Sequence, residues 1–319
     1  MSRNGAGLGP YRAERVAVCN GTTHGADHGI VTYLQQRVET GTASPELLAH
    51  ATGWVARQLA QETGAAGPNL TLDTACSAGL NAMGQARKLL QSGRADVVIA
   101  GGHDVFSYLN FVGFNSLKAL DPQGCRPFSV DRQGLSLGDG AAYVVLEPEA
   151  QARARGAQIL GVITGYGNGG EGYHPTSPDP EGHGAFRAMQ QALSTEDIHA
   201  LRYISAHGTG TPANDGAELN AIQRLLEQGA VKGPVYISSL KRQVGHTLGG
   251  AGAMQVVASL ACMSRGLIPG NPGLTHPIPH PPSMICLAEP LQCPSPIPLA
   301  LCNSFGFGGS VASLCLRLE

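Results

Sequence analysis

The amino-acid sequence predicts an α/β protein built from two similar halves, 1–150 and 151–319. In each half, short apolar segments alternate with segments whose apolar residues recur at helical spacing. Strand, helix and strand follow one another within 69–100, which is the order of a βαβ unit. The pattern starts again near residue 150, so an old duplication is compatible with the sequence.

The first half opens with a short buried strand and continues into the βαβ unit, whose helix is rich in small residues and ends at Gly93. The apolar positions of 45–62 recur at helical spacing, which predicts a further helix. In chain order, the predicted elements are a strand at 15–20, a helix at 45–62, a strand at 69–75, a helix at 77–92, a strand at 95–100, a helical segment within 106–120, a strand at 138–147 and a helix at 149–155.

The second half repeats the alternation of strands and helices. Its predicted elements are a strand at 158–164, a helix at 182–193, a strand at 203–206, a helix at 216–228, a strand at 235–238, a helix at 250–265 and strands at 296–303 and 311–318. The Pro-rich stretch 271–298 is expected to be an irregular surface excursion. Residues that follow the strands lie at their carboxyl ends, where α/β proteins build their sites.

Composition is typical of a well-buried, turn-rich enzyme. The chain has 319 residues, of which 42% are hydrophobic, 14% are charged and 44 are glycine. A net charge of −2 and a single Trp argue against a nucleic-acid partner. No apolar run reaches the roughly 18 residues that span a bilayer, so no membrane span is expected.

The eight cysteines form no CxxC pair, so no metal site is expected. They are spread through apolar segments of a large chain, which is typical of reduced thiols. The first residues contain no apolar secretion signal. These observations together predict a cytoplasmic location.

The candidate nucleophile is Cys76, which lies in DTACSAG between a strand-like run and a helical run. At such a turn the helix N-terminus is expected to lower the thiol pKa and favour the thiolate. The alternative is an inert core thiol, which is our interpretation of the other seven cysteines.

Two histidines in glycine-rich segments, His207 in AHGTGT and His246 in VGHTLGG, indicate two roles. Neutral imidazoles can donate hydrogen bonds to a carbonyl oxygen on which negative charge develops. A buried Lys241 would keep them neutral and would itself need a carboxylate, for which Glu218 is the best-placed candidate. The alternatives are a satisfied core histidine and a solvated surface lysine.

The segment 303–309, NSFGFGG, is dense in glycine and carries two phenylalanines. Such a loop can bring backbone N–H groups close to a reacting oxygen. The alternative is a tight connection between two strands.

These motifs resemble those of β-ketoacyl-acyl-carrier-protein synthases, in which DTACSAG, AHGTGT with a following D-x-x-E, K-x-x-x-GH and NSFGFGG occur in this order. Further similarity lies in RPFSVDRQG at 126–134, in LGDGA at 137–141, and in YHPTSP at 173–178, which resembles elongating type II enzymes. The resemblance runs from about residue 15 to the end, and four ordered motifs make it specific.

The resemblance implies a thiolase-like fold, in which two similar βαβαβ halves stack as α-β-α-β-α layers. It implies a homodimer, or a heterodimer with another ketosynthase-like chain, and no cofactor. Compared with the family, the first strand of the N-terminal half is missing, which would leave an inner gap with unpaired backbone groups in the sheet.

The resemblance also implies a decarboxylative Claisen condensation. Cys76 would accept an acyl group from an acyl-carrier-protein thioester, and His207 and His246 would assist decarboxylation of malonyl-carrier protein. The carbanion would attack the Cys76 thioester and lengthen the chain by two carbons. The other implied roles are an oxyanion hole of the Cys76 and Phe307 N–H groups, a gate formed by Phe307 and Phe305, support from Lys241 and Glu218, and substrate contacts from Thr209, Thr211 and His174.

Two other functions stay open. A chain-length-factor-like subunit, which shapes a pocket in a ketosynthase heterodimer, usually lacks the cysteine that is present here. A Cys–His hydrolase would leave the second histidine and Lys241 without a role and would need water in the site. The acyl chain length, its saturation, and the choice between fatty-acid and polyketide biosynthesis do not follow from the sequence.

Overall fold

A computed structural model describes residues 10–319 apart from 26, 45–46, 48–51, 230 and 232. Its strands are β1 (Val16–Gly21), β2 (Asn69–Leu72), β3 (Val97–Asp104), β4 (Gly140–Leu146), β5 (Val162–Gly170), β6 (Tyr203–Ser205), β7 (Val235–Ser238), β8 (Leu267–Ile268), β9 (Met284–Cys286), β10 (Leu291–Gln292), β11 (Leu299–Gly306) and β12 (Ser310–Arg317). Its α-helices are α1 (Asp27–Thr40), α2 (Trp54–Thr63), α3 (Ala78–Gln91), α4 (Tyr108–Ser116), α5 (Glu149–Ala154), α6 (His183–Ala192), α7 (Thr195–Ala200), α8 (Pro212–Gly229), α9 (Lys241–Val244) and α10 (Ala251–Met263).

The strands form two main sheets. The first has the order β2-β1-β3-β4, with β1 parallel to both neighbours and β4 antiparallel to β3. The second has the order β5-β12-β11-β6-β7-β9, in which β11, β6, β7 and β9 run parallel and β12 is antiparallel to β11. A small third sheet pairs β10 with β8.

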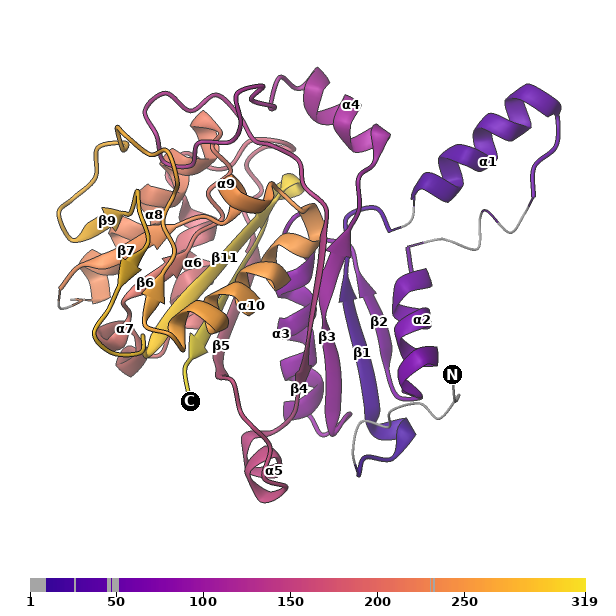
Figure 1. Ribbon diagram of the computed structural model, residues 1–319, viewed down its shortest axis with the longest axis horizontal. Helices are drawn as coiled ribbons and strands as arrows, with labels where there is room; N and C mark the ends of the chain where they lie inside the picture. The colour runs from indigo at the N-terminus through magenta and orange to yellow at the C-terminus, as the bar shows by residue number, and fades with distance from the viewer. Residues whose placement is uncertain (1–9, 26, 45–46, 48–51, 230, 232) are drawn as a thin grey trace.

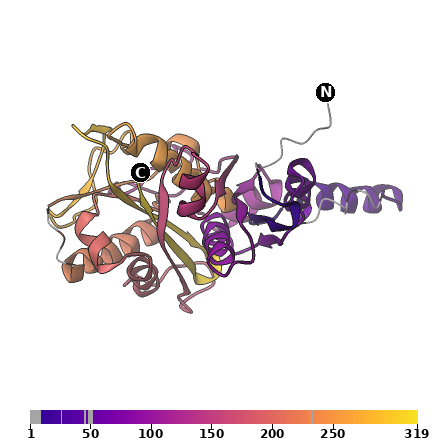
Figure 2. The ribbon, with the colours of Figure 1, turned by 90° about the horizontal axis from the view of Figure 1, so that it is seen from below.

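Helices separate and cover the sheets (Figure 1). Helices α3 and α10 lie between the two sheets and contact strands of both. Helix α2 packs on the outer side of the first sheet, whereas α6 and α8 cover the outer side of the second. The view from below in Figure 2 shows the same succession of layers. This arrangement confirms the predicted thiolase-like α-β-α-β-α fold.

The central layer holds a core shared by both halves. It combines side chains of α3 and α10 with inward-facing side chains of both sheets, such as Leu80, Val98, Val256 and Leu314. Because helix α3 is rich in alanine and glycine, it can pack closely between two sheets. The core therefore fixes the position of the N-terminus of α3, next to Cys76.

The expected gap in the first sheet is not present. Strand β1 pairs along its whole length with β3, from Val16 opposite Val97 to Gly21 opposite Gly102, and pairs with β2 on its other side. The prediction of unpaired inner backbone groups was therefore wrong for the described residues, because two strands that flank the expected gap pair directly.

Two other segments differ from the sequence predictions. The stretch 271–298 contributes β9 to the second sheet and buries Met284, so it is only partly an irregular excursion. Helix α1 was not predicted; it projects from the body of the molecule and leaves Leu34 and Val38 exposed. The helix predicted at 45–62 is α2 in its last part, and much of its first part lies outside the described residues.

Within the described part of the chain, no helix has both the length and the apolar character needed to cross a membrane. Nor do the described His, Cys, Asp and Glu residues form a group of three or more that could hold a metal ion.

Candidate active site

The predicted site residues meet at the carboxyl ends of β2, β6, β7 and β11, which come from both sheets. They surround a cavity of about 320 Å³. Its lining includes the sequence-predicted residues Cys76, His174, His207, Thr209, Thr211, His246, Phe305 and Phe307. Lys241 and Glu218 are buried behind this lining. The fold thus brings together side chains that lie up to 231 positions apart in the sequence, the separation between Cys76 and Phe307.

Cys76 lies in the turn between β2 and α3, and is almost completely buried. The residue before it, Ala75, has a left-handed φ of 50°, which is a strained value for a residue with a side chain. The Ser304 hydroxyl donates a hydrogen bond of 2.7 Å to the Cys76 carbonyl, and so ties the turn to β11. The turn is therefore fixed by both halves of the protein.

The electrostatics of Cys76 differ from the sequence prediction. Burial raises the pKa of the thiol to about 12, although the charge of Lys241 and the backbone N–H groups of Cys76 and Phe307 favour the thiolate. The expectation of a lowered pKa at the helix N-terminus was wrong, because desolvation of a buried sulfur outweighs these effects. Cys76 rests as a neutral thiol.

His207 follows β6, and its ring packs against those of His246 and Phe305. The ring centroids are 5.3 Å apart for the two histidines and 5.5 Å apart for His207 and Phe305. Burial, followed by the charge of Lys241 and by His246, holds the pKa of His207 well below its usual value. The imidazole is therefore neutral at physiological pH, as the sequence analysis expected.

His246 is also buried and neutral. Burial and the charge of Lys241 lower its pKa well below the usual value. Its backbone N–H donates to the Ser136 carbonyl at 2.7 Å, and its carbonyl accepts from the Gly138 N–H at 3.1 Å. The Nδ1 atom is buried without a hydrogen-bond partner among the described residues.

Lys241 supports the histidines from behind the cavity. Its ammonium donates to the His207 carbonyl and lies 3.4 Å from the Nδ1 of the same residue. Burial lowers the pKa of Lys241, and the charge of Glu218 opposes this effect. The predicted burial of Lys241 is therefore what the structure shows.

Glu218 does not form the expected ion pair with Lys241: no contact within 4.0 Å joins the two side chains among the described residues. Its two carboxylate oxygens instead accept the backbone N–H groups of His207 and Gly208, both at 2.8 Å. Asn303 donates a further hydrogen bond to Glu218 at 3.1 Å. Glu218 therefore fixes the backbone of the His207 loop.

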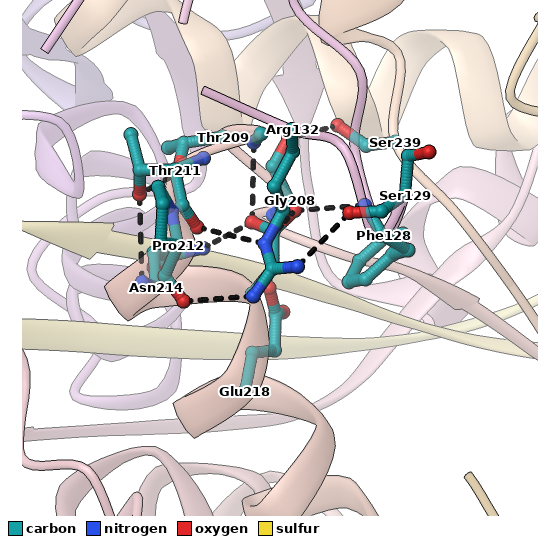
Figure 3. Close-up of polar contacts among 12 residues, drawn as sticks. Phe128, Ser129, Arg132, Gly208, Thr209, Thr211, Pro212, Asn214, Glu218 and Ser239 are labelled. Carbon is teal, nitrogen blue, oxygen red and sulfur yellow. Dashed lines mark hydrogen bonds and ion pairs between the residues drawn. The ribbon is translucent and has the colours of Figure 1, made fainter. Parts of the chain in front are cut away.

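The loop 207–214 is held by the segment 126–134 (Figure 3). Arg132 donates to the carbonyls of Ser129, Thr211 and Pro212, at 2.9, 3.3 and 2.9 Å. Thr209 and Thr211 join their hydroxyl groups at 2.8 Å on the same loop. The side chains predicted to contact substrate are therefore held in one place by the rest of the protein.

The two phenylalanines of NSFGFGG lie differently. Phe305 is buried against His207, whereas Phe307 is 39% exposed and stacks at 5.5 Å on Phe114 of α4. The backbone N–H of Gly308 donates to the Pro175 carbonyl at 2.7 Å, which ties this loop to the loop that carries His174. Phe307 therefore lines the cavity and is partly open to solvent; its role as a gate stays a prediction.

Sequence reasoning missed two buried side chains behind the site. Gln255 of α10 donates to the carbonyls of Ser205 and Ala206, directly before His207, at 3.4 and 2.6 Å. Asp104 at the end of β3 accepts a hydrogen bond from Gly249, close after His246. Both residues follow short glycine-rich stretches, but no spacing in the sequence marks them as partners of the histidine loops, and only the fold brings them there.

Comparison with known proteins gives a consistent result. Residues 4–152 match the family described as "Beta-ketoacyl synthase, N-terminal domain", and residues 160–275 match "Beta-ketoacyl synthase, C-terminal domain". The chain is 34% identical to the 3-oxoacyl-[acyl-carrier-protein] synthase 2 of Vibrio cholerae over 99% of its own length and 79% of that protein. It is 41% identical to the protein of the same name from Rhizobium meliloti over 79% of its own length.

The chain spans only 61% of that Rhizobium relative. Among solved structures, the one titled "The ishigamide ketosynthase/chain length factor" superposes with a TM-score of 0.85 and 31% identity. The match covers 95% of this chain and 75% of that one. The two domain matches, the 34% identity over nearly the whole chain and the shared fold show that this chain belongs to the β-ketoacyl synthase family.

Proposed function

We propose that this protein is a 3-oxoacyl-acyl-carrier-protein synthase, an acyltransferase that extends an acyl chain by decarboxylative Claisen condensation. The observation that carries the proposal is the cavity of about 320 Å³ that Cys76 shares with two neutral histidines. A Cys–His hydrolase would use one imidazole, whereas here two buried imidazoles lie within 5.3 Å of each other.

The first step transfers the acyl group from the carrier-protein thioester to Cys76. A new carbon–sulfur bond forms at Cys76 and the bond to the carrier thiol breaks. The exchange is thiol for thiol, so the proton lost by Cys76 balances the proton gained by the carrier. The N–H groups of Cys76 and Phe307, which favour negative charge at the sulfur, are suited to stabilise the oxyanion of this step.

The second step uses malonyl-carrier protein. Loss of carbon dioxide leaves its electron pair as an enolate, whose oxygen His207 and His246 would stabilise by donating hydrogen bonds. The carbanion attacks the carbonyl carbon of the acyl group on Cys76 and releases the sulfur, which takes up a proton. A neutral imidazole suits this role because it donates without bringing a buried charge.

Carrier protein and a second subunit are the proposed partners. The names of the relatives support a carrier-protein substrate, and β2 offers an open sheet edge with Asn69 and Leu70 exposed. We propose that a second copy, or another ketosynthase-like chain, pairs there. Light scattering of the isolated chain tests this, and an active monomer would contradict it.

Two further parts of the proposal concern location and pathway. The eight cysteines are all free thiols, which supports a cytoplasmic location. The name of the relatives supports a role in fatty-acid biosynthesis. The similarity to the ishigamide ketosynthase/chain length factor structure supports a polyketide pathway as the alternative.

The test is the acylation of Cys76. The thiol pKa does not distinguish Cys76 from other cysteines, because burial also raises the pKa of Cys19 and Cys302 to about 12. Its position in the lining of the cavity does distinguish it. Incubation with acyl-carrier protein and peptide mass spectrometry should find the acyl group on Cys76 alone. C76A should lose the adduct and condensation, whereas C19A should keep both. An adduct elsewhere with Cys76 free would refute the assignment.

The second candidate is a chain-length-factor-like subunit, which the ishigamide structure brings into view. It predicts no acyl adduct on Cys76 of the isolated chain. It also predicts that condensation in a mixture with a ketosynthase depends on the partner's cysteine and survives C76A here. Condensation that requires Cys76 favours the enzyme.

A further inference from the structure

Three backbone segments meet beside the active site with almost no space between them. Gly249, three residues after His246, lies against the end of β1: a Cβ atom there would be 2.6 Å from the Thr22 Cα. A Cβ on Gly79, in the first turn of α3, would be 2.6 Å from the Gly249 carbonyl oxygen. The His246 loop therefore packs backbone to backbone on the half that carries Cys76.

Asp104 is the charged residue at this junction. It ends β3 and is 2% exposed. One carboxylate oxygen accepts the N–H groups of Gly249 at 2.7 Å and Thr23 at 2.9 Å. The other accepts the hydroxyl of Thr22 at 2.6 Å. A single side chain thus joins the end of β1, the end of β3 and the His246 loop.

No described Lys or Arg lies within ion-pair distance of Asp104. Burying a carboxylate without a cation is costly unless its oxygens are hydrogen-bonded, and here three donors satisfy them. Because a buried acceptor of two backbone N–H groups cannot shift without leaving them unpaired, the contact is stiff.

The loop is held from its other side as well. The Ser136 carbonyl and the Gly138 N–H bind the backbone of His246 itself, and both belong to the same half as Cys76. Leu248, between His246 and Gly249, has a left-handed φ of 46°. A strained backbone of this kind persists only where its surroundings fix both ends.

We propose that Asp104 is a positioning residue that sets the place of His246 relative to Cys76 by anchoring Gly249. The inference rests on the proposed condensing activity. Asp104 does not line the cavity and holds the His246 loop through Gly249. Its charge also raises the pKa of the Cys76 thiol, so its loss should displace one imidazole without making Cys76 harder to ionise.

The experiment follows two half-reactions separately: acylation of Cys76 by mass, and release of carbon dioxide from malonyl-carrier protein. D104A should lower decarboxylation about 100-fold, the cost of losing one placed donor to an oxyanion, and should slow acylation less than about threefold. In D104N the amide oxygen can still accept both backbone N–H groups, so decarboxylation should return to within about tenfold of wild type.

The matched control is D96A, at the other end of the same strand. Asp96 precedes β3 and pairs with Arg15 at 2.6 Å, far from the histidine loops. D96A should leave the ratio of the two half-reactions unchanged. A folded D104A that decarboxylates at the wild-type rate overturns the proposal, as does a parallel loss of acylation and decarboxylation.

If D104A does not fold, G249A tests the same contact, because its methyl group would push the loop from Thr22. It should show the same selective loss of decarboxylation, whereas G216A, where a Cβ has open space on α8, should not. G249A with an unchanged ratio overturns the proposal. A wild-type protein inactive in both half-reactions refutes the proposed function instead.

Discussion

The two histidines of the site lie side by side but are held by different halves of the molecule. His207 is supported by Glu218 and Lys241, which belong to the same half and sheet system as His207 itself. His246 is carried by that half too, yet Ser136 and, through Gly249, Asp104 anchor it to the half that contains Cys76.

This difference separates two geometric requirements of the proposed reaction. The place of His246 relative to Cys76 is set by direct contacts of its loop with the half that carries Cys76, whereas the distance between His207 and Cys76 depends on how the two halves pack. The Ser304 hydroxyl on the Cys76 carbonyl is one contact across that boundary. Variants that act on one histidine loop alone can therefore test the two requirements separately.

The largest expected effect comes from removing either imidazole. H207A and H246A should each lower decarboxylation and condensation on the order of 10²–10³-fold, because each removes a preorganised donor to the enolate oxygen. Acylation of Cys76 should change much less in both. Carbon dioxide release and peptide mass spectrometry give the two rates.

A loss of acylation as strong as the loss of decarboxylation, in either variant, would contradict the assignment of that histidine to the enolate oxygen. That result would assign the imidazole to the Cys76 thiol instead. H199A is the matched control, because His199 is an exposed histidine on α7 that does not line the cavity; both rates should stay at the wild-type level.

An intermediate effect is expected from K241M. Burial is the main cause of the low pKa of both histidines, and the charge of Lys241 lowers it further. Without that charge both pKa values should rise. Since the neutral form is the active one, decarboxylation should then fail at a higher pH on the acid side.

The pH dependence of carbon dioxide release measures this shift, with K88M on the exposed side of α3 as control. His207 should contribute more of the shift, because the Lys241 ammonium lies 3.4 Å from its Nδ1. An unchanged acid limb in K241M would show that Lys241 acts through the loop backbone alone.

The strands and the motif residues were predictable because both are local in sequence. Cys76 and His207 follow apolar runs, and the structure places each after a strand, whereas the helix α9 separates His246 from β7. The Asp104 contact was not predictable, since its partners are 81 to 145 positions away and no local pattern marks them. Helix α1 was not predicted for a related reason: its apolar residues are exposed and do not gather on one face of the helix.

The thiol pKa and the partners of Glu218 show a second limit. The sequence placed Cys76 at a helix N-terminus, but how deeply the sulfur is buried depends on packing from both halves. For Glu218, spacing could bring it near the His207 loop but could not distinguish a lysine partner from backbone N–H groups. The first error concerns the desolvation of a side chain, and the second concerns where a side chain points. Both are defined only in the folded protein.

The smallest expected effect is on the free energy of unfolding, and it comes from Glu218, which supports the His207 loop. Burial raises the pKa of Glu218 to about 7. Because this folded-state value lies above the unfolded one, the native protein binds more protons between about pH 4.5 and about pH 7. The stability that protonated Glu218 contributes is therefore fully present below about pH 4.5 and is lost as the pH rises through about 7.

E218Q removes this titration. It should be less stable than wild type at every pH, because the amide cannot accept both backbone N–H groups. The stability advantage of wild type over E218Q should shrink by about 2 kcal/mol between about pH 5 and about pH 7, since one pKa unit corresponds to about 1.4 kcal/mol and the carboxyl is only half ionised at the upper end of this range. Urea unfolding at the two pH values measures it, with E227Q on the exposed face of α8 as control. An advantage that stays constant, or grows with pH, would mean that Glu218 is already ionised in the folded protein. The His207 loop would then be held by a permanent carboxylate.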